Sequence, residues 1–528
     1  MFIFNKNLVA SKKRIVLTYL FLTLIFLLLM KIDYRFINQI QCCGDDYDYY
    51  LHAETIAINK NLSYEDQVLG DYAYRNNGKV APVGFFGSGL LAAPFLYMGE
   101  LFFKYFENSD IDLLMNFKIL FYSLSSIFYF FLSIFISHIS LKSLNIKFNP
   151  LILLAIYLSS GLQYYAFERY SMTHVYEVFG ISLTIFLSLK FFKDNNKLSL
   201  FLIPISIYLN LLIRMSNIFV ILVPLFIKLT LKSNNLHNKN HKFLNSKYFY
   251  FGFLIGTSIY FYISFTLFGE IIFNPRKIYA PELSNYEVIG TTVDFGSLIL
   301  SILNSFKIIF FSLEFGLLWT NPILLIVVFS ACLKIKNQEN KLLIISFLQL
   351  FFLVFIWQST ASSYGFRYLY PLLPVAIIHY YINFSNKSRL NKVFLVFCFI
   401  SFLQYLFFET HPMTQLSTEY VINSFGNNVI YSAPKYVLGV GNAFLDINSY
   451  LNIVSTSFLG AIIFKIILSI VGQDKLLILL DNFGLPVGNE NFINLLSSLK
   501  EIAGFKFFIV YFYISIFSYL IIKIKQKL

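Results

Sequence analysis

Long apolar runs with few charged side chains are the feature that most constrains this chain. A helix needs about 20 mostly apolar residues to cross about 30 Å of hydrocarbon. Only 13% of the residues are charged and 57% are hydrophobic, against roughly a quarter and roughly 45–50% in soluble domains. The sequence therefore predicts an all-α membrane protein with about twelve spanning helices. The predicted segments are 15–30, 114–137, 150–166, 176–192, 199–213, 217–232, 248–268, 314–333, 342–358, 367–384, 393–408 and 507–523.

The distribution of Lys and Arg predicts which loops are cytoplasmic, because basic residues in short loops stay on that side. The seven loops and tails expected inside together hold 23 basic and two acidic residues, which leaves 18 of the 41 basic and 26 of the 28 acidic residues elsewhere. The net charge of +13 is therefore explained by topology, and a nucleic-acid partner is not expected. These predicted inner segments are 1–14, 138–149, 190–198, 228–247, 334–341, 385–392 and 523–528.

The amino terminus is predicted to be cytoplasmic, in an inner (plasma) membrane of bacterial type. The first apolar segment lacks a small-residue cleavage site, so we expect it to be retained as a helix. Three divisions follow: a membrane module at 1–408 with a long first outer loop at about 31–113, an extracytoplasmic segment of unknown role at 409–506, and a last helix with a basic tail at 507–528.

Two further apolar runs, 85–103 and 454–471, are predicted to be interfacial. A crossing at either would move later basic loops to the outer side, against the charge rule. Within the first run, Gly87, Gly89 and Pro94 indicate either a flexible lip or ordinary packing.

The strongest chemical signal is the acidic stretch 44–54 in the first outer loop. Asp45, Asp46, Asp48 and Glu54 place four carboxylates within eleven residues. Crowded carboxylates are hard to ionise unless a cation, a metal or a proton-donating substrate shares their site. The cluster is therefore a candidate general base, and a solvated acidic loop is the alternative.

Other ionisable residues fall at predicted outer helix ends, where charged groups are costly and often functional. Glu168, Arg169, His174 and Glu177 occupy a short outer loop, Arg214 lies at a hairpin tip, and Arg367 follows Tyr364-Gly365-Phe366. A structural Glu168–Arg169 pair and a buried packing histidine are the alternatives here.

In these motifs the sequence resembles the GT-C superfamily of polytopic membrane glycosyltransferases, which includes protein O-mannosyltransferases and aminoarabinose transferases. Gly44-Asp45-Asp46-Tyr47-Asp48-Tyr49 is similar to the family's first-loop element, and Met172-Thr173-His174 to its Met-Ser-His element. Gly316–Pro322 and Tyr364–Tyr368 resemble later elements. Asp45 corresponds to the family's catalytic aspartate, while Asp46 replaces the usual glutamate and leaves open which carboxylate is the base.

The resemblance implies a GT-C-type helical bundle that moves a sugar from a polyprenyl-phosphate donor to an extracytoplasmic lipid, glycan or protein. Asp45 or Asp46 would take the acceptor's proton during an inverting attack. A divalent ion held by Glu168 and the first-loop acids is an open alternative to a metal-free site. The expected substrate-binding residues are Asp48, Glu168, Arg169, His174, Arg214, Arg367 and Tyr368.

Two other functions use the same lipid-linked sugars. A transporter or flippase would place ionisable residues deep within the helices. A polymerase or ligase of the O-antigen type would depend on arginines in a large late loop. The acidic first loop favours the glycosyltransferase.

Overall fold

The computed structural model describes most of one compact unit of the chain, residues 41–405 together with 437–440. Residues 1–40, 406–436 and 441–528 form a second unit. The described residues are 45–65, 69, 73–106, 117–146, 148–167, 169–233, 246–273, 278, 303, 307, 309–311, 316–357, 367–384, 388–407, 466, 470–472, 474, 475 and 478.

The first outer loop begins with a helix and a small hairpin. Helix α2 (Asp45–Glu54) continues into the short π-helix η1 (Thr55–Asn59), and strands β1 (Tyr74–Asn76) and β2 (Lys79–Ala81) pair antiparallel with Arg75 opposite Val80. The turn residues Asn77 and Gly78 both have positive φ, 52° and 67°, which is the requirement of a two-residue type I′ hairpin. Helix α3 (Phe86–Phe106) follows.

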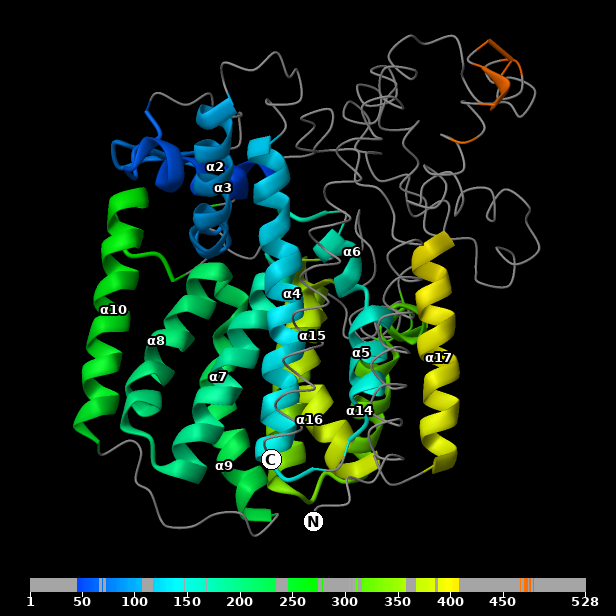
Figure 1. The fold of residues 1–528 in the computed structure, drawn as a ribbon. Coiled ribbons are helices and arrows are strands. Elements are labelled where there is room, and N and C mark those ends of the chain that lie inside the picture. The colour runs from blue at the N-terminus through cyan, green and yellow to red at the C-terminus, as the bar shows by residue number, and fades with distance from the viewer. Residues whose placement is uncertain are drawn as a thin grey trace, which may run out of the picture. The chain divides into compact units, whose positions relative to one another are not determined.

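Long helices form the main body of the unit (Figure 1). They are α4 (Phe117–Ser143), α7 (His174–Asp194), α8 (Lys197–Ile213), α10 (Lys247–Phe268), α15 (Gln338–Trp357) and α17 (Ser388–Phe407). The tight turn between α7 and α8 follows from its residues. Asn195 ends α7 in the left-handed region (φ 53°), and the Asn196 side chain caps α8 by accepting the Ser199 N–H.

Four other helices are each divided into a longer α-helical part, here called regular, and a shorter part of α- or 3₁₀-helix, here called irregular. The regular parts are α5 (Pro150–Ser159), α9 (Val223–Ser233), α14 (Pro322–Leu333) and α16 (Leu373–Phe384), with 10, 11, 12 and 12 residues. Their irregular partners are α6 (Leu162–Phe167), the 3₁₀ helix η3 (Met215–Leu222), α13 (Leu317–Thr320) and the 3₁₀ helix η6 (Arg367–Leu372). At 1.5 Å per residue each regular part is about 15–18 Å long, roughly half of a hydrocarbon core.

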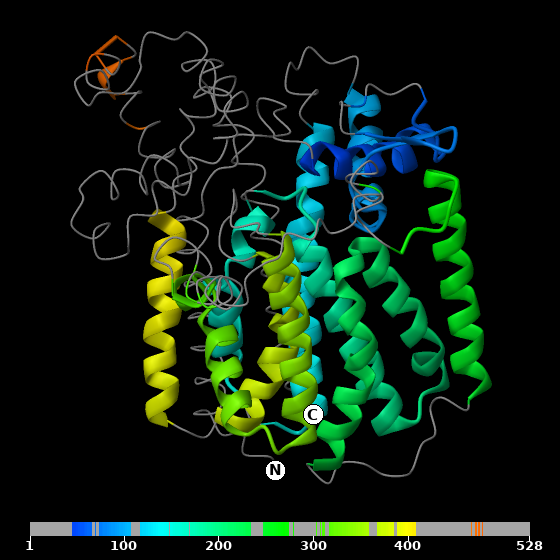
Figure 2. The same ribbon diagram turned by 180° about the vertical axis from the view of Figure 1, so that it is seen from behind.

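The regular parts gather at one end of the unit, which we call the inner end. There the Lys334 ammonium donates to the Asn383 side chain and the Tyr381 hydroxyl to the Asn149 carbonyl, which joins the ends of α14, α16 and α5. The irregular parts, the starts of α4 and α7 and the end of α8 lie at the opposite, outer end (Figures 1 and 2). This alternation places every described loop at the end that the charge pattern predicts.

The all-α membrane class is confirmed at a coarse level. By length and composition, five helices could cross a membrane: 86–105, 118–143, 174–194, 215–232 and 247–268. Ten of the twelve predicted segments overlap a described helix or a broken pair, whereas 15–30 and 507–523 lie outside the described residues, as do 409–465. The count of twelve stays a prediction.

Helix α3 occupies the run that we predicted to be interfacial. It packs along the outer half of α4, where Phe95 meets Phe128 and the Tyr129 hydroxyl donates to the Leu91 carbonyl. Its start abuts the end of α8, so that α3 lies above α8 in Figure 1. Helix α3 is long and apolar enough to cross a membrane, so its interfacial placement stays a prediction.

The fully buried His52 holds the first outer loop together. A carbonyl can only accept, so His52 Nε2–H donates to the Gly84 carbonyl (2.9 Å) while the Tyr64 hydroxyl donates to Nδ1 (2.6 Å). Burial lowers the pKa of His52 to about 4. The unfolded chain therefore binds the proton first as the pH falls.

We expect acid to weaken this loop through His52. The contribution of neutral His52 to the free energy of unfolding is fully present above pH 6.5. It is lost as the pH falls from 6.5 to about 4, by about 3 kcal/mol in all. The His52→Gln variant keeps a neutral donor toward Gly84 and should lose that dependence. Thermal unfolding of both proteins in detergent across pH 4–8 tests this, and equal slopes for the two would contradict it.

Candidate active site

A buried ion pair joins the first outer loop to the loop after α6. Arg169 Nε donates to Asp46 Oδ2 at 2.8 Å, and each side chain is only 2–3% exposed. Two of the predicted site residues, 123 positions apart, are thus brought together. Because Asp46 is buried, the alternative interpretation of the acidic stretch as a solvated loop does not hold for this residue. Arg169 pairs with Asp46, and Glu168, its alternative partner, lies outside the described residues.

Further hydrogen bonds fix the start of α2 against α4. The Ser171 hydroxyl donates to the Asp46 carbonyl and bonds the Tyr122 hydroxyl at 2.8 Å. Because Tyr122 lies on α4, these bonds fix α2 on a long helix. The ion pair is therefore held from both of its ends.

The remaining first-loop carboxylates differ in their surroundings. Asp45 begins α2, but its side chain is outside the described part of the chain. Asp48 is half-buried and accepts the Gly84 N–H at 3.2 Å. Glu54 accepts the Tyr50 hydroxyl at 3.1 Å, and burial raises the pKa of Glu54 above its ordinary value. Asp48 is thus close to Gly84, whereas Glu54 points to Tyr50.

A second group of charged side chains is centred on Glu177, which is fully buried near the start of α7. Its Oε1 accepts the Thr173 hydroxyl at 2.6 Å and lies 3.0 Å from His174 Nδ1 and 3.5 Å from Arg214 Nη1. We did not select Glu177 from the sequence as a site residue. The sequence signal for Glu177 was its spacing from His174, because residues three apart on a helix lie on the same face.

Tyr368 connects two arginines to this group. The Arg214 guanidinium lies 4.3 Å and the Arg367 guanidinium 5.2 Å from the centre of the Tyr368 ring, and Arg367 Nη2 also donates to its hydroxyl at 3.3 Å. The His174 ring is edge-on to the same ring at 6.3 Å. Four predicted substrate-binding residues therefore meet here. They come from α7, the end of α8 and η6.

The Glu177 group brings two arginines together in a mostly buried place. Arg214 is 14% and Arg367 9% exposed, and Glu177 lies within 3.5 Å of Arg214 Nη1. A guanidinium group keeps its positive charge and presents a planar set of donors, so two of them side by side suit an anionic ligand such as a phosphate.

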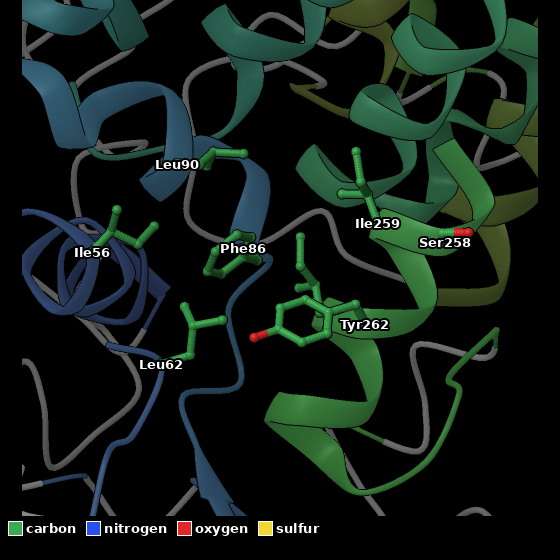
Figure 3. Close-up of a pocket in the computed structure, with 8 residues that line it drawn as sticks. Ile56, Leu62, Phe86, Leu90, Ser258, Ile259 and Tyr262 are labelled. Carbon is green, nitrogen blue, oxygen red and sulfur yellow. The ribbon is translucent and has the colours of Figure 1, made fainter. Parts of the chain in front are cut away.

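An apolar groove lies between α10, the start of α3 and the segment that follows α2 (Figure 3). Its volume is about 480 Å³, and the side chains of α10, the start of α3 and η1 converge on it. Such a space, open at the surface of a membrane protein, suits a hydrocarbon chain. The lining residues are Ile56, Leu62, Phe86, Leu90, Ser258, Ile259, Tyr262 and Ile263.

The groove and Arg214 are joined through one close contact between helices. Gly87, next to the groove residue Phe86, lies against Ile213, where an added Cβ would be 2.4 Å from the Ile213 nitrogen. Arg214 is the next residue, and Met215 after it packs on the same apolar cluster as Phe86. The apolar groove and the cationic group are thus neighbours in the fold.

The described residues contain no evident metal site. Within the described ranges, no three His, Cys, Asp or Glu side chains are arranged to hold a metal ion. The divalent-ion alternative also involves Glu168, outside those ranges, and stays a prediction.

No family model, curated protein or solved structure matches the chain.

Proposed function

We propose that this chain is a membrane glycosyltransferase that takes a sugar from a polyprenyl-phosphate donor and transfers it, with inversion, to an extracytoplasmic acceptor. The outer end would face the extracytoplasmic side of a bacterial inner membrane. The observation that carries the proposal is the cationic group of Arg214 and Arg367, with His174 against the same tyrosine ring, near an apolar groove. A phosphate attached to a long hydrocarbon chain needs both features next to each other.

The proposed reaction is a single displacement. The acceptor oxygen or nitrogen forms a bond to the anomeric carbon while the bond from that carbon to the phosphate oxygen breaks. The electron pair of the broken bond leaves on the phosphate, where Arg214 and Arg367 stabilise the added negative charge. The acceptor's proton passes to a first-loop carboxylate. No metal takes part in this scheme.

The ion pair favours Asp45 over Asp46 as the base. Asp46 Oδ2 already accepts from Arg169, and protonating it would leave a guanidinium buried without its counter-charge. Asp46 and Arg169 then act as positioning residues that fix the start of α2. Asp45, the adjacent residue, takes the proton.

Transfer in isolated membranes tests the proposal. We expect Asp45→Asn to reduce sugar transfer about 10²–10⁴-fold while folded protein stays at the parental amount, because a positioned base contributes about that factor. The donors are polyprenyl phosphates carrying individual radiolabelled hexoses or pentoses.

Asp194→Asn is the matched control, because Asp194 is exposed at the inner end of α7 and should not affect transfer. Parental turnover in Asp45→Asn would reject Asp45 as the base, and parental turnover in Asp46→Asn as well would reject both candidate aspartates.

A transporter of lipid-linked sugars is the second candidate. The observation that favours it is the set of four helices broken about halfway, since broken helices form the binding sites of many transporters. Against it, every buried Asp, Glu or Arg in the described part of the chain lies toward the outer end. A transporter would move lipid-linked sugar across vesicles without an acceptor. The buried residues are Asp46, Glu100, Arg169, Glu177 and Arg367.

A further inference from the structure

Two of the helix breaks meet inside the unit. The break between α5 and α6 lies at Ser160 and Gly161, and the break between α13 and α14 lies at Asn321. The Gly161 N–H donates to the Thr320 carbonyl at 2.7 Å, so the two breaks are in direct contact. Irregular backbone at membrane depth is tolerated where it is buried in protein or lines a polar space.

Buried amide groups flank this contact without hydrogen-bond partners. Gln163 and Asn321 are both 0% exposed, and within the described residues neither the amide oxygen nor the amide nitrogen of either side chain has a partner. The indole N–H of Trp319 is in the same state. Buried polar atoms of native proteins almost always have partners, and leaving them unpaired is costly. We therefore expect the amide atoms of Gln163 and Asn321 and the Trp319 indole N–H to form hydrogen bonds with polar atoms that do not belong to the described residues.

The chemistry of these five atoms selects a neutral ligand with hydroxyl groups. Each carboxamide offers both donors and an acceptor, and the indole adds one donor. An ammonium group would satisfy only the acceptors and a phosphate only the donors, whereas hydroxyl groups satisfy both. We propose that Gln163, Trp319 and Asn321 form a carbohydrate-binding subsite. As the subsite for the transferred sugar, it rests on the proposed function.

The position of the subsite fits a sugar attached to a phosphate. Tyr165, two residues after Gln163, contacts the His174 ring at 4.7 Å and the Tyr370 ring at 6.0 Å. Helix α6 therefore carries the Gln163 amide within one turn of a side chain that contacts the cationic group, with the two side chains on different sides of the helix. A sugar and its phosphate are likewise directly bonded neighbours in the donor.

Tryptophan fluorescence provides the test. The chain has two tryptophans, so the Trp357→Phe variant leaves Trp319 as the only one. The probes are octyl glycosides of glucose, galactose, mannose and N-acetylglucosamine, added below their micelle concentrations to protein in lipid nanodiscs. Tetraethylene glycol octyl ether has the same chain without a sugar and is the control. We expect a shift of Trp319 emission with at least one glycoside and none with the ether.

Variants separate ligand binding from structure. Gln163→Leu and Asn321→Leu remove the amide atoms at similar volume, so the unliganded proteins should unfold at the parental temperature or above it. Both should lose the glycoside-induced shift and any glycoside-induced rise in unfolding temperature. Gln338→Leu, the same change at an exposed residue at the start of α15, should respond as the parent does.

Several results would overturn the subsite. They are an equal response to the ether, an unchanged response in the leucine variants, or leucine variants that unfold at lower temperature while the parent ignores every glycoside. The last result would mean that water or packing satisfies the amides. Glycoside binding without any transfer activity would instead reject the proposed reaction and leave the subsite standing.

Discussion

Replacing Arg169 with methionine is expected to destabilise the protein by about 3–5 kcal/mol, because it leaves the Asp46 carboxylate buried without its cation. The measurement is reversible unfolding in mixed detergent, followed as the fraction of folded protein against denaturant. Transfer activity should fall with it, since the start of α2 loses its attachment. An Arg169→Met protein as stable as the parent would show that the pair contributes little to the fold.

A double variant separates stability from chemistry. Asp46→Leu combined with Arg169→Met replaces the buried pair by apolar side chains, an exchange that is often neutral or stabilising. We expect stability to return close to the parental value while sugar transfer stays low. If transfer also returned, the pair would have no positioning role beyond holding the fold.

The second large effect is expected from Gly87→Ala. An added Cβ would lie 2.4 Å from the Ile213 nitrogen and 2.6 Å from the Leu212 carbonyl carbon, and both are backbone atoms that cannot rotate away. Overpacking of this kind costs typically 1–3 kcal/mol, and we expect at least about 3 kcal/mol here. Size-exclusion profiles and thermal unfolding of detergent-solubilised protein measure the loss.

Gly78→Asn is the control for this change. Nothing lies within 4 Å of the added atom at Gly78, and asparagine tolerates its φ of +67°. This variant should keep the parental profile. A Gly87→Ala protein with that same profile would mean that α3 and α8 are farther apart than described. The close contact at Gly87 is what ordinary packing of this glycine-rich run predicts, and the flexible lip stays the alternative.

Much of the fold was predictable because membrane helices have a strong local signal. Uncharged apolar runs gave the helix positions, and basic loops gave the alternation of their ends. The breaks at 150–166 and 314–333 were missed, because these mostly apolar ranges were interpreted as continuous helices. Their signals were short: Ser159-Ser160-Gly161 and Asn321-Pro322. Proline begins helices well but removes a donor within them.

The candidate site was only partly predictable from the sequence. Residue type and outer position selected Arg169, His174, Arg214 and Arg367, since ionisable groups are rare in apolar segments. The partners of these residues could not be predicted, because no local pattern connects Arg169 with a residue 123 positions away. Glu177 was noted in its outer loop but not selected as a site residue, because its importance lies in three contacts that only the folded α7 brings together.

The four short inner helices affect where the membrane voltage falls across the protein. If the irregular outer parts border water, most of the voltage falls across the inner layer of about 15–18 Å. Moving one charge through the whole voltage is worth about 2.3 kcal/mol per 100 mV. Arg214 and Arg367 lie outside that layer, so negative charge could develop beside them with little electrical work. The reaction at the outer end would then depend little on the membrane voltage.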